Sequence, residues 1–269
     1  MVAFPPSKIN LGLNVLQRRD DGYHDIDTCF YPVPFTDILE LVPGEETSFT
    51  STGLAIPGPR AENLCVKAFQ LLQKKHSIPG AKIHLHKIIP TGAGLGGGSS
   101  DAAHTLRLAN EMFSLNLAKS DLTHYASLLG SDCPFFLFDS PMMGAGRGEV
   151  LSPTIIDLSG KYLLLVNPGL HVSTAEAYAG ISPRYPDQPL DSILSLPVKE
   201  WKRELVNDFE ESVFKRFPLI RDIKEYLYAT GALYASMSGS GSSVYALYET
   251  EPMRDLSTID PYMLWRGYL

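Results

Sequence analysis

A run of glycines and serines in the middle of the chain is the feature best suited to chemistry. Residues 90–103 read PTGAGLGGGSSDAA. Five glycines in this run let an anion approach the backbone N–H groups directly, because no side chain stands in the way. A helix that begins after them would point its first N–H groups and the positive end of its dipole at the same place. This composition predicts a site for phosphate groups.

The stretches on either side of the run have the periods of a strand and a helix. Residues 82–89 alternate between apolar and polar side chains, as a half-buried strand does. Apolar residues after the run recur every three or four positions as far as Phe113, which predicts an amphipathic helix. Ser99, Ser100 or Asp101 is expected to cap this helix. The order strand, glycine loop and helix favours a phosphate site over a flexible surface loop.

Two known phosphate motifs are alternatives. A Walker A loop ends in Gly-Lys-Ser/Thr, and the run contains no lysine. Gly92, Gly94 and Gly97 fit G-x-G-x-x-G, so an NAD-dependent oxidoreductase is a second alternative. A dinucleotide fold would begin with a wholly apolar parallel strand and soon return to another strand. Here the strand alternates and a second helix is predicted over residues 120–129, which disfavours that fold.

PTGAGLGGGSSDAA resembles the second motif of the small-molecule kinases that include galactokinase, homoserine, mevalonate and phosphomevalonate kinases. The triple glycine resembles in particular the family of 4-diphosphocytidyl-2-C-methyl-D-erythritol kinases of the non-mevalonate isoprenoid pathway. By this resemblance the ATP-binding residues are Asn63, Pro90, Gly92, Gly94, Leu95, Gly96, Gly97, Gly98, Ser99 and Ser100. From its position alone, Asn63 is an ordinary helix N-cap. Lys87, next to the run, is a possible nucleotide contact.

Two further segments resemble this family and imply the catalytic pair. Residues 6–16 alternate as a strand and resemble its first motif, which implies that Lys8 lies beside the catalytic aspartate and that Asn10 faces the substrate. GSDCPFF, from Gly130, resembles the family's G-[AS]-D-V-P-F segment and implies that Asp132 is the catalytic base. We expect Asp132 at the start of a buried strand. Without the resemblance, Lys8 is a surface charge and Asp132 a turn residue.

The substrate side is implied by three segments. RRDDGYH predicts a hairpin turn, and its GYH resembles the cytidine-binding element of the family. Histidine can pair with a pyrimidine edge, and tyrosine offers a stacking face. SMSGSGSS resembles the third motif, although alone it is a hairpin turn. PGLHVSTAEAY resembles the substrate loop of the family and implies that Thr174 and Tyr178 lie near the cytidine, although packing within its own helix is nearly as good an interpretation of Tyr178. The residues implied are Asn10, Tyr23, His24, Thr174, Tyr178, Ser238, Gly239, Ser240 and Gly241.

The overall composition limits the other functions that are possible. The 269 residues carry a net charge of −7 without a basic run, which argues against nucleic acid as a partner. No stretch approaches the roughly 20 apolar residues that span a membrane. Three distant cysteines indicate neither disulfides nor zinc, and His84 and His86 lack further ligands, so no protein metal site is predicted. We expect a cytoplasmic enzyme, either a monomer or a weak homodimer.

The resemblance also implies the architecture and the reaction. It implies an α+β fold with an N-terminal domain like the second domain of ribosomal protein S5 and a ferredoxin-like C-terminal domain. ATP binding and catalysis fall to residues 1–150 and the substrate side to residues 151–269, with residues 142–149 a flexible connection. ATP with Mg²⁺ would phosphorylate the 2-hydroxyl of 4-diphosphocytidyl-2-C-methyl-D-erythritol. A sister kinase for homoserine, mevalonate or a sugar, and a nucleotide-binding module without turnover, are the alternatives.

Overall fold

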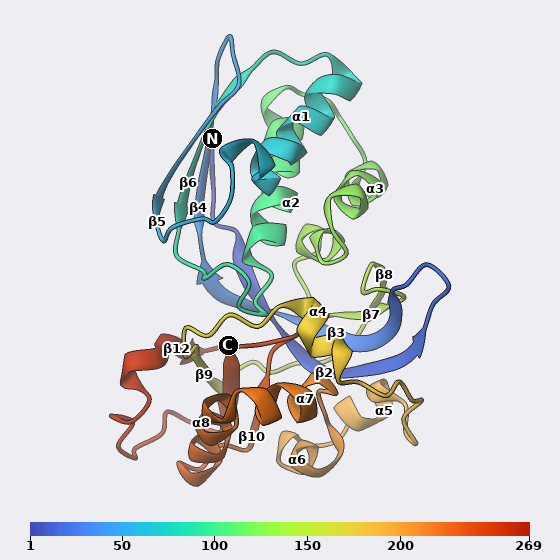
Figure 1. The fold of residues 1–269 in the computed structure, drawn as a ribbon. Coiled ribbons are helices and arrows are strands. Elements are labelled where there is room, and N and C mark those ends of the chain that lie inside the picture. The colour runs from blue at the N-terminus through green and yellow to red at the C-terminus, as the bar shows by residue number, and fades with distance from the viewer. The chain divides into compact units, whose positions relative to one another are not determined.

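Helices and strands are mixed along the chain, as the α+β prediction requires (Figure 1). The computed structural model describes residues 1–269, and contacts divide them into two compact units. Unit 1 consists of Met1–Lys8, Pro32–Thr91 and Gly96–Ser140, and unit 2 of Ile9–Tyr31, Gly92–Leu95 and Pro141–Leu269. Two long strands, β2 (Pro6–Arg18) and β3 (His24–Thr36), contribute residues to both units. The chain therefore passes from one unit to the other within β2, β3 and the glycine run.

Unit 1 contains a sheet in the order β1-β4-β6-β5, with helices on one face (Figure 1). Its elements are β1 (Val2–Ala3), β4 (Ile38–Pro43), β5 (Ser48–Gly53), η1 (Arg60–Glu62), α1 (Leu64–His76), β6 (Ala81–Lys87), α2 (Gly97–Met112), α3 (Lys119–Leu129) and η2 (Cys133–Leu137). Strand β6 pairs antiparallel with β4 and parallel with β5. Its predicted alternation is confirmed, because Ile83 and Leu85 are buried while Lys82, His84 and His86 are at least partly exposed.

The helix predicted after the glycine run is α2, and α3 is the second helix predicted behind it. A helix follows α2 where a dinucleotide fold would return to a strand. The strand before the run also pairs with β4 in the antiparallel direction. Unit 1 is therefore not a dinucleotide-binding fold.

Unit 2 contains the antiparallel sheet β10-β11-β9-β12. Its elements are β7 (Met142–Ala145), β8 (Val150–Pro153), β9 (Tyr162–Val166), α4 (Thr174–Ala179), α5 (Leu190–Leu194), η3 (Val198–Glu200), α6 (Trp201–Glu204), α7 (Phe209–Arg216), α8 (Pro218–Ala229), β10 (Tyr234–Met237), β11 (Val244–Tyr248), η4 (Asp260–Tyr262) and β12 (Met263–Tyr268). Every residue of β9 and β11 is buried. Ile220, Ile223 and Leu227 recur at helical spacing on α8 and pack into the core against this sheet.

The second glycine stretch, predicted to be a flexible connection, is a β-hairpin. Strands β7 and β8 pair antiparallel, and they extend the sheet β2-β3-β7-β8. Gly146 and Gly148 have φ angles of 66° and 106°, which only glycine adopts readily, and they form the turn. The prediction was wrong because clustered glycines occur in tight turns as well as in flexible connections.

None of the helices combines the length and the apolar character that a membrane-spanning helix needs.

Candidate active site

Helix α2 begins directly at the glycine run. Its N-cap is Gly96, whose φ of 69° is left-handed, and a Cβ there would lie 2.7 Å from the ring of Phe136. The helical hydrogen bonds start with the Ser100 N–H donating to the Gly96 carbonyl at 2.9 Å. The amides of residues 97–99 therefore have no partner within the helix. These amides, at the positive end of α2, are suited to hold phosphate oxygens.

The residues predicted to cap α2 lie inside it. Ser99, Ser100 and Asp101 follow Gly97 in the first turns, and no side chain caps the helix. The prediction was wrong because Gly96 takes the cap position with a left-handed backbone. The Ser100 hydroxyl oxygen is buried there and has no hydrogen-bond partner.

A buried charge cluster lies beside the first turns of α2. The Lys87 ammonium, at the end of β6, lies 2.5 Å from a carboxylate oxygen of Asp37 and 2.7 Å from one of Asp101. All three side chains are at most 3% exposed. Asp37 also accepts the backbone N–H groups of Ile88 and Ile89, at 2.5 and 2.9 Å. The cluster thus joins β6, the start of β4 and the helix at the glycine run.

The protonation of this cluster follows from its burial. Burial by itself lowers the pKa of Lys87, but the two carboxylates outweigh it, and the net effect is a raised pKa. Burial raises the pKa of Asp101 to about 7, because it outweighs the opposite effect of Lys87, and the nearby Asp37 carboxylate raises this pKa as well. Lys87, a possible nucleotide contact by sequence, is thus enclosed by acids. Sequence did not indicate Asp37, which lies 50 positions from Lys87.

The structure brings Lys8 and Asp132 together. The Lys8 ammonium lies 3.5 Å from a carboxylate oxygen of Asp132, and their side chains are 4% and 34% exposed. Burial lowers the pKa of Lys8, while Asp132 acts in the opposite direction. A Cβ on Gly96 would lie 3.1 Å from the Lys8 side chain, so the lysine borders the glycine run. One region of unit 1 therefore contains the buried Lys8 ammonium, the partly exposed Asp132 carboxylate and the first amides of α2.

Asp132 precedes a helical turn instead of the predicted buried strand. The five residues after it form the 3₁₀-helix η2, with Pro134 in its first positions. Proline fixes φ near the helical value, which starts such a turn. Phe135 and Phe136 are buried, and η2 packs against α2 and α3. The prediction was wrong because a short apolar run does not distinguish a buried strand from a buried helical turn.

In unit 2, residues from all three predicted motifs meet at one hydroxyl. The Ser238 side chain donates to the Gly94 carbonyl at 2.8 Å and accepts the Asn10 backbone N–H at 3.3 Å. A Cβ on Gly94 would lie only 2.0 Å from the Ser238 carbonyl oxygen, so the backbones approach as only glycine permits. Gly239 is also close, since its Cβ would lie 3.4 Å from the Asn10 side-chain oxygen.

Aromatic residues predicted to bind the substrate also gather in unit 2. The rings of His24 and Tyr178 are stacked, with centroids 4.6 Å apart and planes at 12°. The ring of Tyr23, which is 56% exposed, lies 5.0 Å from the Arg147 guanidinium. Burial, with Arg18 nearby, lowers the pKa of His24, which favours the neutral ring with one donor and one acceptor. Thr174 lies one turn before Tyr178 on α4.

The other predicted residues have less specific surroundings. Asn63 is the N-cap of α1 and accepts the Cys65 N–H at 2.9 Å, which confirms the cap interpretation. The Leu95 side chain is buried, so only its backbone is available to a ligand. The remaining residues lie in or beside the two glycine loops: Pro90, Gly92, Gly98, Ser240 and Gly241.

Comparison with known proteins identifies the family of this chain. The profile described as "GHMP kinases N terminal domain" matches residues 63–140, and "GHMP kinases C terminal" matches residues 194–255. The chain belongs to the GHMP kinase family. The predicted two-domain α+β kinase fold is thereby confirmed.

The relatives of known name are more specific. The 4-diphosphocytidyl-2-C-methyl-D-erythritol kinase of Cytophaga hutchinsonii is 51% identical over 253 residues, which cover 94% of each chain. The enzyme of the same name from Parabacteroides distasonis is 48% identical over the full length of both chains. A crystal structure of 4-(cytidine 5'-diphospho)-2C-methyl-D-erythritol kinase aligns with a TM-score of 0.80 and 34% identity, covering 93% of this chain and 91% of that one. Within the GHMP kinases, the chain thus groups with the kinases of this name.

Proposed function

We propose that this chain transfers the γ-phosphoryl group of ATP to the 2-hydroxyl of 4-diphosphocytidyl-2-C-methyl-D-erythritol. The relatives named for this activity, about half identical over nearly the whole chain, support the substrate. The observation that carries the reaction type is the Lys8–Asp132 pair beside the start of α2. A mevalonate kinase structure aligns well in fold but is only 15% identical, so it supports no other substrate.

The chemistry needs few groups. The 2-hydroxyl oxygen forms a bond to the γ-phosphorus as the bond to the bridging β,γ-oxygen breaks, and ADP leaves. Asp132 accepts the hydroxyl proton, because its carboxylate is a base and is the more exposed member of the Lys8–Asp132 pair. Lys8 stabilises the negative charge on the phosphoryl oxygens, and its burial strengthens that interaction. The amides of residues 97–99 hold the phosphates at the helix N-terminus.

The cytidine side rests on unit 2. We assign the pyrimidine edge to His24, whose neutral ring can both donate and accept. The stacked pair His24–Tyr178 and the exposed Tyr23 provide aromatic faces for the base. Thr174 and the second glycine loop, with Ser238, Gly239, Ser240 and Gly241, would contact the rest of the substrate. A substrate without a base would make no use of these aromatic faces.

Mg²⁺ is also part of the proposal. No three acidic, histidine or cysteine side chains are grouped to hold a metal ion, which suits a metal bound mainly by phosphate oxygens and water. The Ser100 hydroxyl, unpartnered at the start of α2, is an oxygen available at the place proposed for the phosphates. When bound, Mg²⁺ would neutralise charge on the triphosphate. Ser100 is the residue we propose for it.

The proposal also assigns a role to each part of the chain, a cellular location and an oligomeric state. We assign ATP binding and catalysis to residues 1–150 and the substrate side to residues 151–269, to which β2, β3 and the turn between them add Asn10, His24 and Tyr23. Asn63 and residues 90–100 complete the ATP site. We also propose a cytoplasmic location. We further propose that the protein is a monomer or a weak homodimer, and sedimentation at micromolar concentration would test this oligomeric state.

A substrate panel tests the function. Purified protein would be incubated with ATP, Mg²⁺ and one acceptor at a time, and ADP release would be measured. We expect turnover with 4-diphosphocytidyl-2-C-methyl-D-erythritol and none with homoserine, mevalonate or galactose. Faster turnover with any of the other three would favour a sister kinase. ATP binding without turnover on any acceptor would favour the module that binds nucleotide only.

A further inference from the structure

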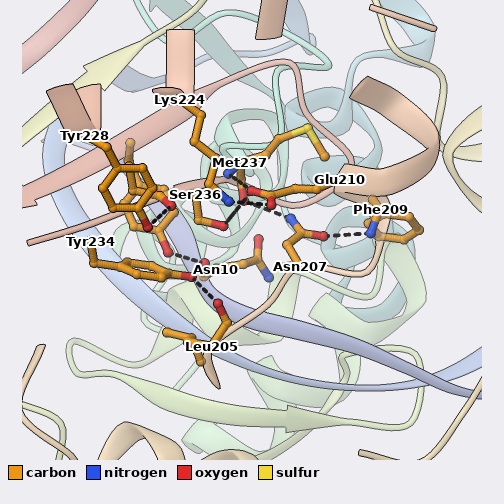
Figure 2. Close-up of polar contacts among 12 residues, drawn as sticks. Asn10, Leu205, Asn207, Phe209, Glu210, Lys224, Tyr228, Tyr234, Ser236 and Met237 are labelled. Atoms are coloured by element: carbon orange, nitrogen blue, oxygen red, sulfur yellow. Dashed lines mark hydrogen bonds and ion pairs between the residues drawn. The ribbon is translucent and has the colours of Figure 1, made fainter. Parts of the chain in front are cut away.

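Residues 205–210, which lead from α6 into α7, are hydrogen-bonded to β10 and to Gly239 in the 238–243 loop that follows it; the contacts with β10 are drawn in Figure 2. This segment has no glycine and contains none of the residues assigned a role above. We propose that Asn207 and Glu210 are positioning residues, which hold the 238–243 loop against β2 in the geometry that the acceptor substrate requires. The inference rests on the function proposed above and adds two residues to it.

Asn207 holds the loop on both sides of Ser238. Its side-chain amide donates one hydrogen to the Met237 carbonyl at 2.8 Å and the other to the Gly239 carbonyl at 2.9 Å. Its amide oxygen accepts the Phe209 N–H at 3.0 Å, and the residue is 3% exposed. Both N–H donors and the oxygen of the side-chain amide are thus engaged inside the protein. Because two carbonyls that flank Ser238 are fixed, Ser238 between them is fixed too.

Glu210 holds the end of β10 that leads into the loop. Its carboxylate accepts the Met237 N–H at 2.8 Å and the Ser236 hydroxyl at 3.1 Å (Figure 2). Lys224 of α8 pairs with its other oxygen, and the Glu210 side chain is only 13% exposed. Met237 is therefore held through both its N–H and its carbonyl, by Glu210 and Asn207 respectively.

The same segment is also bonded to β2, the strand that carries Asn10. The Leu13 N–H donates to the Val206 carbonyl and the Asp208 N–H to the Leu13 carbonyl, both at 2.9 Å. The Asp208 carboxylate accepts the Val15 N–H at 2.7 Å. Residues 205–210 therefore tie β2 and the 238–243 loop to one support.

The support from residues 205–210 fixes the position of the Ser238 hydroxyl, which is hydrogen-bonded to Asn10 and to Gly94. Its two hydrogen bonds, at 3.3 and 2.8 Å, connect the loop to β2 and to the glycine run. Displacement of about 1 Å between reacting groups can lower a rate by about 100-fold. The polar atoms of Asn207 and Glu210 are engaged inside the protein, so their effect on the reaction would pass through Ser238 and its neighbours.

Asn207→Asp is the sharpest test, because it keeps the shape and replaces the two N–H donors by an oxygen facing two carbonyl oxygens. Tyr248→Phe is the matched control. Tyr248 lies at the far end of β11 from the loop, and its buried hydroxyl bonds to Thr230 at 2.7 Å and to the Leu227 carbonyl at 3.2 Å. Both variants remove buried hydrogen bonds from unit 2, but only Asn207→Asp changes the support of the loop.

Steady-state kinetics with 4-diphosphocytidyl-2-C-methyl-D-erythritol and ATP would be compared with the affinity for a non-hydrolysable ATP analogue. For Asn207→Asp we expect kcat/KM for the acceptor to fall about 10- to 100-fold while the analogue affinity stays within about threefold. Tyr248→Phe should keep kcat/KM within about threefold. Glu210→Gln, which retains an acceptor for the Met237 N–H, should be more active than Glu210→Ala. The inference is overturned if Asn207→Asp keeps wild-type kcat/KM, or if Tyr248→Phe loses as much.

Amide hydrogen exchange tests the same support without any substrate. The N–H groups of Ser238, Gly241 and Ser243 are bonded to the Ser243, Ser238 and Ala93 carbonyls. Their exchange should accelerate about tenfold or more in Asn207→Asp and stay unchanged in Tyr248→Phe. A wild-type protein without kinase activity would refute the proposed function, whereas exchange would still decide whether Asn207 holds the loop. Unchanged exchange in Asn207→Asp would overturn the inference whatever the acceptor proves to be.

Discussion

Replacing Lys87 by methionine would leave two buried carboxylates without their shared counter-ion. Asp37 and Asp101 are at most 3% exposed, and both bond to the Lys87 ammonium. Removing one partner of a buried ion pair lowers the free energy of unfolding by about 3–5 kcal/mol. Since two carboxylates lose the same partner, we expect a loss of about 5 kcal/mol. In a chain of this size, that corresponds to a Tm lower by roughly 10–20 °C.

Thermal unfolding followed by circular dichroism would measure the effect, with Lys82→Met as the control. Lys82 lies on the same strand but is exposed, so its replacement should change the free energy of unfolding by less than about 0.5 kcal/mol. The loss in Lys87→Met should depend on pH. The pKa of Asp101, already raised to about 7 from 3.8, would rise further without Lys87. The folded variant then binds more protons than the unfolded chain above about pH 4, so its free energy of unfolding falls as the pH rises. In the wild type this fall ends near pH 7, where Asp101 titrates, whereas in the variant it continues to higher pH.

The difference from wild type should therefore be smaller at pH 5 than at pH 8. Lys87→Met combined with Asp101→Asn removes one of the two stranded charges and should recover part of the lost Tm at pH 8. A Lys87→Met protein that melts within about 2 °C of Lys82→Met would refute the reasoning. It would mean that water or rearrangement solvates the two carboxylates at little cost in free energy.

Three further variants test the site. Asp132→Asn should lower kcat by about 100-fold or more with ATP-analogue affinity unchanged, and near-normal turnover would remove Asp132 from the catalytic role. Tyr178→Ala breaks the stack with His24 and should raise KM for the cytidylyl substrate about tenfold but not KM for ATP; Tyr185→Ala, which changes an exposed ring, should do neither. Asn63→Ala removes the cap of α1 and should lower the Tm by roughly 2–4 °C, so an unchanged Tm would contradict the capping role.

The sequence predicted the elements around the glycine run well because each rests on a local period. The alternation before the run became β6, and the apolar spacing after it became α2. The errors have local causes too. The helix cap fell on Gly96 because a left-handed glycine ends the loop without help from a side chain. The apolar residues after Asp132 became a helical turn because Pro134 fixes the backbone there.

Local sequence patterns could not predict which remote residues contact the site residues. Asp37 binds Lys87 from 50 positions away, and Asn207 holds carbonyls 30 and 32 positions away. Neither aspartate nor asparagine carries a period or motif that would have indicated these contacts. Both residues are ordinary turn formers in sequence, and only their burial distinguishes them.

By itself, the sequence determined the strand and the two helices around the glycine run, the character of that run as a site suited to phosphate groups, and the three motifs that resemble a kinase family. Short-range sterics and hydrophobic periodicity are encoded within a few residues, so they can be read along the chain. Only the tertiary structure decided that Lys8 meets Asp132, that Lys87 is enclosed by two acids, and that Asn207 fixes the carbonyls around Ser238. Those contacts depend on burial and on distances between remote segments, which arise only when the chain packs.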